Sequence, residues 1–185
     1  MAASAEFKRI YQHGALVIWP PDDLRAIVGA LRQRYDPASQ AICDAHITLS
    51  QPFLSAPTED DLSKISEVVA RHLPLEIEYG PLGTFLPYPC VYLQIEPAEP
   101  LKALQRALYN LDLFNLALPF SDPDAYIFHM SLTDGYPVEA QTRQILEALA
   151  GSEPVGRFNA GSVAWIKPNA DFHFETVKLF GSGTP

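Results

Sequence analysis

One four-residue pattern occurs twice in this chain: a histidine, an apolar residue, a hydroxyl-bearing residue and a second apolar residue. It is found at residues 46–49 (His-Ile-Thr-Leu) and 129–132 (His-Met-Ser-Leu), so 83 positions separate the two histidines. Each copy lies in a segment with the character of a strand, and each is preceded by another strand and a helix. This recurrence predicts two similar lobes that each contribute one such strand, although no residue-level repeat accompanies it.

Apolar periodicity outlines the remaining elements. Helical spacing of apolar residues predicts helices at residues 22–35, 57–73, 97–114 and 138–150. Apolar runs and alternating patterns predict strands at residues 14–19, 45–50, 75–79, 91–95, 127–132, 161–166 and 172–180. Several connections are short enough for antiparallel neighbours. We therefore expect an α+β fold with two similar lobes, antiparallel sheets flanked by helices, and an active groove between the lobes. Residues 1–12 are expected to form a loose N-terminal arm, and residues 13–185 a single bilobal domain.

Charge and composition restrict the partners of the chain. It carries 13 Lys and Arg against 22 Asp and Glu, a formal net charge of −9. This acidity argues against long duplex nucleic acid as a partner, but not against a small phosphate ester. The longest apolar runs, such as residues 14–19, are far shorter than the roughly 20 residues that span a membrane. The two cysteines suit a reducing compartment. We expect a soluble, cytoplasmic monomer that does not bind membranes.

Strand geometry places the histidine and the hydroxyl group of each motif on one face. Side chains alternate along a strand, so His46 and Thr48 share a face and the apolar residues of that motif share the other. His129 and Ser131 are related in the same way. The apolar pair of each motif is expected to pack into a lobe, which leaves the polar pair facing the groove where the lobes meet.

The paired motifs and their spacing resemble those of the 2H phosphoesterase superfamily, which includes the bacterial 2′-5′ RNA ligase-like proteins and the plant cyclic phosphodiesterases. The resemblance covers most of the chain and implies two α+β lobes with one motif strand each. It also implies that His46, Thr48, His129 and Ser131 line the active groove. The second motif has Ser where many members have Thr, and both residues offer the same hydroxyl group.

Two histidines and two hydroxyl groups suit the opening of a 2′,3′-cyclic phosphate, or of a related cyclic ester. The reaction needs a base to activate water and an acid to protonate the leaving oxygen. Histidine, with an ordinary pKa of roughly 6.5, serves in either role near neutral pH. The hydroxyl groups of Thr48 and Ser131 can bind the non-bridging phosphate oxygens. We expect no cofactor and no metal. The residues do not indicate which histidine is the base.

The expected substrate is a nucleotide or an RNA end that carries a cyclic phosphate. Two alternatives remain: a non-catalytic module of the same fold that binds nucleotides or RNA ends, and a 2′-5′ RNA ligase, which the acidic charge disfavours. Phe53 and Tyr136 each follow a motif strand, so either ring is a candidate to stack on a base. Packing in the core or in a loop is the more common role of such aromatic residues.

Overall fold

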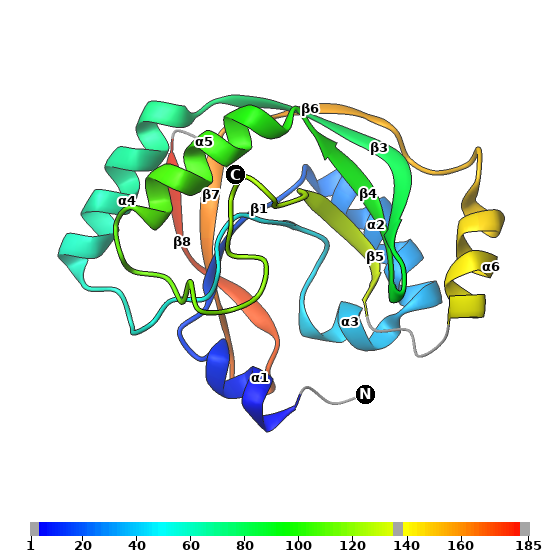
Figure 1. Ribbon diagram of the computed structural model, residues 1–185, viewed down its shortest axis with the longest axis horizontal. Coiled ribbons are helices and arrows are strands. Elements are labelled where there is room, and N and C mark those ends of the chain that lie inside the picture. Colours follow the sequence, from blue (N-terminus) through cyan, green and yellow to red (C-terminus); the bar gives the residue numbers. More distant parts are fainter. Residues whose placement is uncertain (1–3, 135–138, 182–185) are drawn as a thin grey trace.

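Figure 1 shows a computed structural model of the chain, in which residues 4–134 and 139–181 are described. The helices are α1 (Ala5–Ile10), α2 (Asp22–Tyr35), α3 (Pro37–Ile42), α4 (Glu59–His72), α5 (Ala98–Tyr109) and α6 (Glu139–Leu149). The strands are β1 (Ala15–Ile18), β2 (Ile47–Thr48), β3 (Leu75–Phe85), β4 (Tyr88–Glu96), β5 (His129–Asp134), β6 (Gly156–Ala160), β7 (Ser162–Pro168) and β8 (Phe174–Gly181). Within the described residues, no helix is both long enough and apolar enough to cross a membrane.

The strands form two four-stranded antiparallel sheets, which confirms the α+β prediction. The first sheet has the order β2-β1-β7-β8, and the second has the order β5-β4-β3-β6. The two motif strands, β2 and β5, occupy equivalent places because each is an edge strand of its own sheet. Thr48 pairs with Val17 of β1, and Ser131 pairs with Tyr92 of β4.

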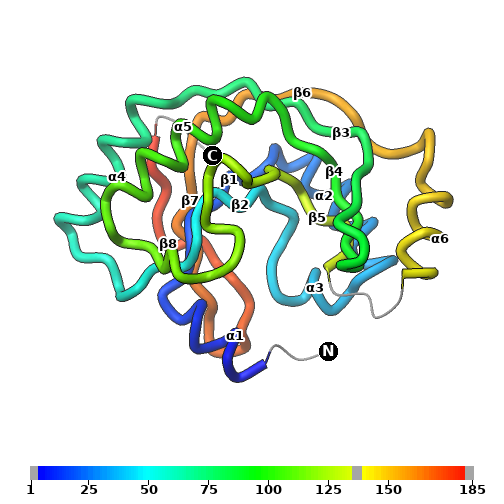
Figure 2. Tube along the Cα trace, viewed as in Figure 1, coloured from blue at the N-terminus to red at the C-terminus, as the bar shows by residue number. Residues whose placement is uncertain are grey.

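Two helices, α2 and α5, are exchanged between the two lobes. Helix α2 follows β1 of the first sheet but contacts β5 of the second sheet. Helix α5 follows β4 of the second sheet but packs against α4, which contacts β8 of the first sheet. The trace in Figure 2 shows the chain crossing from one lobe to the other and back. Each lobe is therefore completed by a helix that comes from the other lobe's part of the sequence.

Local sequence explains the best-defined elements. Helix α4 begins with a capping box, in which the side chains of Thr58 and Asp61 each bind the other residue's backbone N–H. Such a cap stabilises a helix by about 1 kcal/mol. The apolar stripe of α4 includes Ile65, which is fully buried. All four residues of β1 are buried, as its continuous apolar run predicted.

The structure corrects several boundaries. The strand predicted at residues 75–79 is longer than expected, because β3 continues to Phe85 and accommodates Gly80 at a register shift against β4. Gly80 has φ +91°, a conformation that glycine adopts without steric cost. The predicted helix 97–114 ends at Tyr109, and α3 and β6 were not predicted.

Residues 4–11 of the predicted N-terminal arm are folded and pack on the first lobe. Ser4 caps α1 by accepting a hydrogen bond from the backbone N–H of Phe7. The ring of Phe7 lies 5.8 Å from that of Phe172, and the ring of Tyr11 lies 6.0 Å from that of Phe174. Because Phe172 and Phe174 belong to the first lobe, these contacts attach α1 to that lobe.

Candidate active site

A cavity of about 220 Å³ lies between the two motif strands. All four residues that the motifs single out line it: His46 and Thr48 from the first lobe, and His129 and Ser131 from the second. The predicted alternation holds in both strands, since Ile47, Met130 and Leu132 are buried. The fold thus brings two segments that are 83 positions apart to opposite sides of one cavity.

The two imidazole rings are oriented by backbone carbonyl groups. Nδ1 of His46 lies 2.7 Å from the carbonyl oxygen of Asp44, and Nδ1 of His129 lies 2.8 Å from that of Ile127. A carbonyl oxygen only accepts hydrogen bonds, so each Nδ1 carries the proton and donates. In the neutral ring, Nε2 then carries the free lone pair. Each histidine therefore keeps Nε2 for a ligand.

The surroundings of both histidines favour the neutral imidazole. The pKa of His46 is lowered to about 4, chiefly by burial; the hydrogen bond to the Asp44 carbonyl opposes this change, and the charges of nearby Arg32 and His129 add to it. Burial also lowers the pKa of His129, against a hydrogen bond to the Ile127 carbonyl. A bound phosphate would supply a negative charge beside both rings and would favour the imidazolium form.

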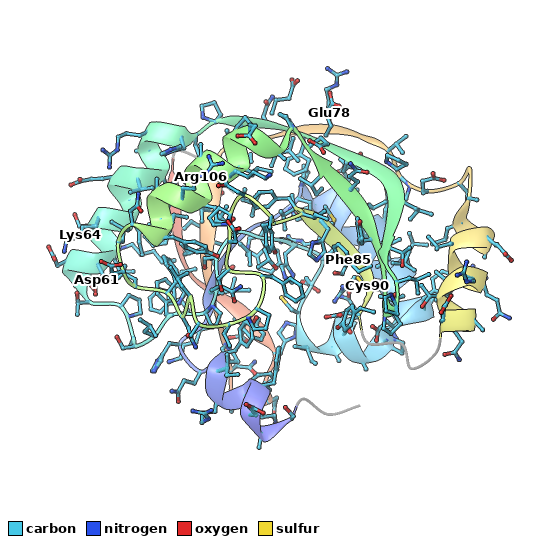
Figure 3. The ribbon with its side chains drawn as sticks, in the orientation of Figure 1. Asp61, Lys64, Glu78, Phe85, Cys90 and Arg106 are labelled. Atoms are coloured by element: carbon cyan, nitrogen blue, oxygen red, sulfur yellow. The ribbon has the colours of Figure 1, made fainter. Side chains whose placement is uncertain are left out.

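Aromatic rings surround the second histidine. The ring of His129 lies 5.0 Å from that of Phe85, 5.4 Å from that of Tyr92 and 6.2 Å from that of Tyr126. Phe85 comes from the end of β3 and is labelled in Figure 3. Among the residues that the structure describes, His46 has one such neighbour, Trp19, at 6.0 Å. These rings limit the positions open to each imidazole and shield it from water.

A buried cation lies against the cavity. Arg32, at the C-terminal end of α2, is 4% exposed and is one of the lining residues. The sequence contains a signal for it, because Arg32 continues the buried stripe of Leu24 and Val28 at intervals of four residues. Ile27, another apolar residue of this helix, lies off the stripe and is 52% exposed.

One of the two aromatic candidates for base stacking lies in the core. Phe53 is 2% exposed, and its ring packs 4.7 Å from that of Phe114 and 6.0 Å from that of Trp165. The prediction for Phe53 is therefore wrong, because core packing covers the ring. Tyr136 lies outside the described residues.

The two cysteines lie close to the motif residues. Sγ of Cys43 is 3.4 Å from Nδ1 of His46, and Sγ of Cys90 is 3.8 Å from Oγ of Ser131. Burial raises the pKa of both thiols to about 12, so both stay protonated and poorly nucleophilic. In the part of the chain that the structure describes, no three His, Cys, Asp or Glu side chains are grouped closely enough to hold a metal ion.

Comparison with known proteins agrees with the family resemblance that the two motifs indicate. The model of the 2′-5′ RNA ligase superfamily matches residues 20–172. A protein of Bacillus pumilus (strain SAFR-032), named "Putative phosphoesterase", is 30% identical over 97 residues. The match covers 51% of this chain and 56% of that protein, so the chain spans about half the length of this relative.

Solved structures share the fold. E. coli LigT complexed with NADP+ matches with a TM-score of 0.57 at 16% identity, over 94% of this chain and 98% of that one. A crystal structure of a phosphoesterase matches with a TM-score of 0.58 at 15% identity, over 94% and 99% of the two chains. Since the family model spans most of the sequence and the two-lobed fold carries both motifs, this chain belongs to the 2′-5′ RNA ligase superfamily of 2H phosphoesterases.

Proposed function

We propose that this protein is a metal-independent cyclic phosphodiesterase that opens 2′,3′-cyclic phosphates of nucleotides or RNA ends. The observation that carries the proposal is the arrangement of His46 and His129. They line one cavity from opposite lobes, and each ring has Nδ1 engaged and Nε2 available. Two such imidazoles provide a base and an acid on two sides of a bound phosphorus atom.

The proposed reaction is an in-line displacement. One neutral imidazole takes a proton from water while the water oxygen forms a bond to phosphorus. The P–O bond to the 2′ or 3′ oxygen breaks, and the other histidine, as imidazolium, gives its proton to that oxygen. Thr48 and Ser131 donate hydrogen bonds to the non-bridging oxygens, where negative charge accumulates. The product is a phosphomonoester, and each histidine ends in the protonation state that the other began with.

Other features support a small phosphate ester as substrate. The cavity, at about 220 Å³, suits a phosphate and its sugar more than a tract of RNA. LigT, which shares the fold, has been crystallised in complex with 3′-AMP, ATP and NADP+. Nucleotides are therefore the ligand class to test first. We further propose that the protein acts as a monomer in the cytoplasm, without membranes or long duplexes as partners.

The decisive experiment is a screen of 2′,3′-cyclic mononucleotides with ³¹P NMR of the products. The proposal expects the cyclic phosphate signal to be replaced by that of one phosphomonoester. Binding without turnover would favour a nucleotide-binding module of the same fold. Joining of RNA halves, with no hydrolysis of mononucleotides, would favour a 2′-5′ RNA ligase.

A further inference from the structure

We propose that Arg32 is a positioning residue whose single guanidinium fixes the two motif segments relative to each other across the cavity. The inference rests on the proposed function, because it assigns Arg32 a role in the same reaction. Arg32 is not expected to touch the reacting atoms. It acts through the backbone and side chains that hold His46 and Ser131.

The guanidinium of Arg32 binds both lobes at once. Its Nη1 donates to the carbonyl oxygen of Ser131 at 2.8 Å, on the motif strand β5. Its Nη2 donates to the carbonyl oxygen of Cys43 at 2.9 Å, three residues before His46. The strands β2 and β5 belong to different sheets, so sheet pairing does not set their separation. Arg32 supplies a direct polar link between β5 and the segment that leads into β2.

A second path leads from Arg32 to the first imidazole. Nε of Arg32 donates to Oε1 of Gln40 at 2.9 Å, and Nε2 of Gln40 donates to Oδ1 of Asp44 at 2.8 Å. The carbonyl oxygen of Asp44 in turn accepts from Nδ1 of His46. A displacement of the Arg32 guanidinium would therefore shift Asp44, the residue whose carbonyl oxygen orients the His46 ring.

The helix that carries Arg32 is anchored to the second lobe. Besides the contact to Ser131, the backbone N–H of Asp134 donates to Oδ2 of Asp36 at 2.8 Å, at the end of α2. Asp36 is itself buried and caps α3 by accepting from the backbone N–H of Ser39. Arg32 thus reaches from a fixed point on one lobe to the segment that leads into the motif of the other.

The chemistry of Arg32 fits a positioning role better than a role in core packing. The three described hydrogen-bond partners are uncharged oxygens, yet the side chain is a buried cation, which is costly to desolvate. A planar guanidinium reaches several acceptors in a fixed geometry, whereas an ammonium group is a single point of contact. The charge also acts on the site, because Arg32 lines the cavity and, after burial, helps to lower the pKa of His46.

The test compares Arg32→Lys with Arg34→Lys, the same substitution on the exposed side of the same helix. Arg32→Lys keeps the charge but loses the planar guanidinium that reaches several acceptors at once. We therefore expect kcat on a cyclic mononucleotide to fall by about ten- to a hundredfold, with KM little changed. Arg34→Lys should retain the wild-type kcat. Circular dichroism and thermal unfolding verify the folded state. A kcat for Arg32→Lys equal to that of wild type, or reduced only in proportion to the folded fraction, would overturn the inference.

A second readout does not depend on turnover. In Arg32→Gln the charge is removed, and the pKa of the His46 imidazole, followed by NMR in the free protein, should rise; Arg34→Gln should leave it unchanged. An unchanged titration of His46 in folded Arg32→Gln would contradict the inference. If wild-type protein opens no cyclic phosphate, the proposed function fails by itself, while this titration still decides the role of Arg32. Should neither Arg32 variant fold, Gln40→Leu breaks the path to Asp44 and should lower kcat with the guanidinium retained.

Discussion

His46 and His129 are held by equivalent hydrogen bonds, since each Nδ1 donates to the carbonyl oxygen of the residue two positions earlier in the chain. Each histidine also lies at the start of an edge strand, β2 in one sheet and β5 in the other. Two lobes with little residue-level similarity therefore present the same nitrogen to one cavity.

The first prediction concerns these two rings. His46→Ala and His129→Ala should each lower kcat by at least about a hundredfold, the lower range for the loss of a general acid or base. His173→Ala is the matched control, because His173 does not line the cavity. Turnover of a cyclic mononucleotide measures the effect, and circular dichroism verifies the fold. Near-normal activity in either motif variant would exclude the two-histidine mechanism.

The hydroxyl groups give a second prediction. Thr48→Val and Ser131→Ala should each lower kcat/KM by about a hundredfold, since each removes a donor to the non-bridging oxygens in the transition state. Thr84→Val is a suitable control, because the buried hydroxyl of Thr84 has no hydrogen-bond partner among the described residues. A loss in the control as large as in the motif variants would point to packing and not to phosphate binding.

The lowered pKa of His46 predicts a pH-dependent stability. Its pKa is about 4 in the folded chain, below the roughly 6.5 of an unfolded one, so the unfolded chain binds the proton first. Stability is therefore complete above about pH 6.5 and falls as the pH drops toward 4, by at most about 3 kcal/mol from this residue.

Urea unfolding at about pH 7 and about pH 5 measures this contribution. His46→Asn should lose less stability between the two values than wild type, whereas His72→Asn, at the end of α4, should behave like wild type. An identical decline in wild type and His46→Asn would mean that the His46 imidazole accepts its proton in the folded state without penalty.

A fourth prediction concerns metals. Two imidazoles and two hydroxyl groups account for every proton transfer and for the developing charge, so activity should persist in excess EDTA. The measurement is kcat/KM before and after chelation. Complete loss with EDTA, restored by zinc or manganese, would replace the proposed mechanism with that of a metallo-phosphodiesterase.

Substrate length gives the last prediction. The chain has 13 basic against 22 acidic residues, so we expect a site that holds one or two phosphates. A cyclic mononucleotide and a cyclic-ended RNA of about 20 nucleotides should then have similar kcat/KM values. The dependence of kcat/KM on salt should be shallow, whereas the affinity of a protein that binds along a single strand falls by roughly 0.7 log units per phosphate for each tenfold rise in salt. A strong preference for the long RNA that disappears with salt would reveal a basic groove.

Patterns within short stretches of the sequence predicted the helices and strands and the direction of the motif side chains. The strand character of both motifs, the helix predicted at residues 57–73 and the shared face of each histidine and its hydroxyl residue all follow from spacing within a few residues. Phe53 shows the limit of this reasoning, because proximity to a motif in sequence does not indicate whether a ring faces the cavity or the core.

Features that depend on the partner of an element could not be predicted. Tyr92 lies near His129 because of the register between β4 and β5, and Arg32 is buried because α2 packs on the other lobe's sheet. Neither the register nor the exchange of helices leaves a periodic signal in the chain. The sequence offered only the stripe of α2, in which a cation occupies a position that an apolar residue usually fills.

The order of strands in the first sheet has a consequence for synthesis. Strand β1 lies between β2, which is only two residues long, and β7, which begins at Ser162. While the chain emerges from the ribosome, β1 and the adjoining motif at His46 lack their main partner until most of the protein has been made. A translation product that stops before β7 therefore contains both histidines but lacks the strand that pairs with β1 beside the His46 motif. Such fragments should be inactive.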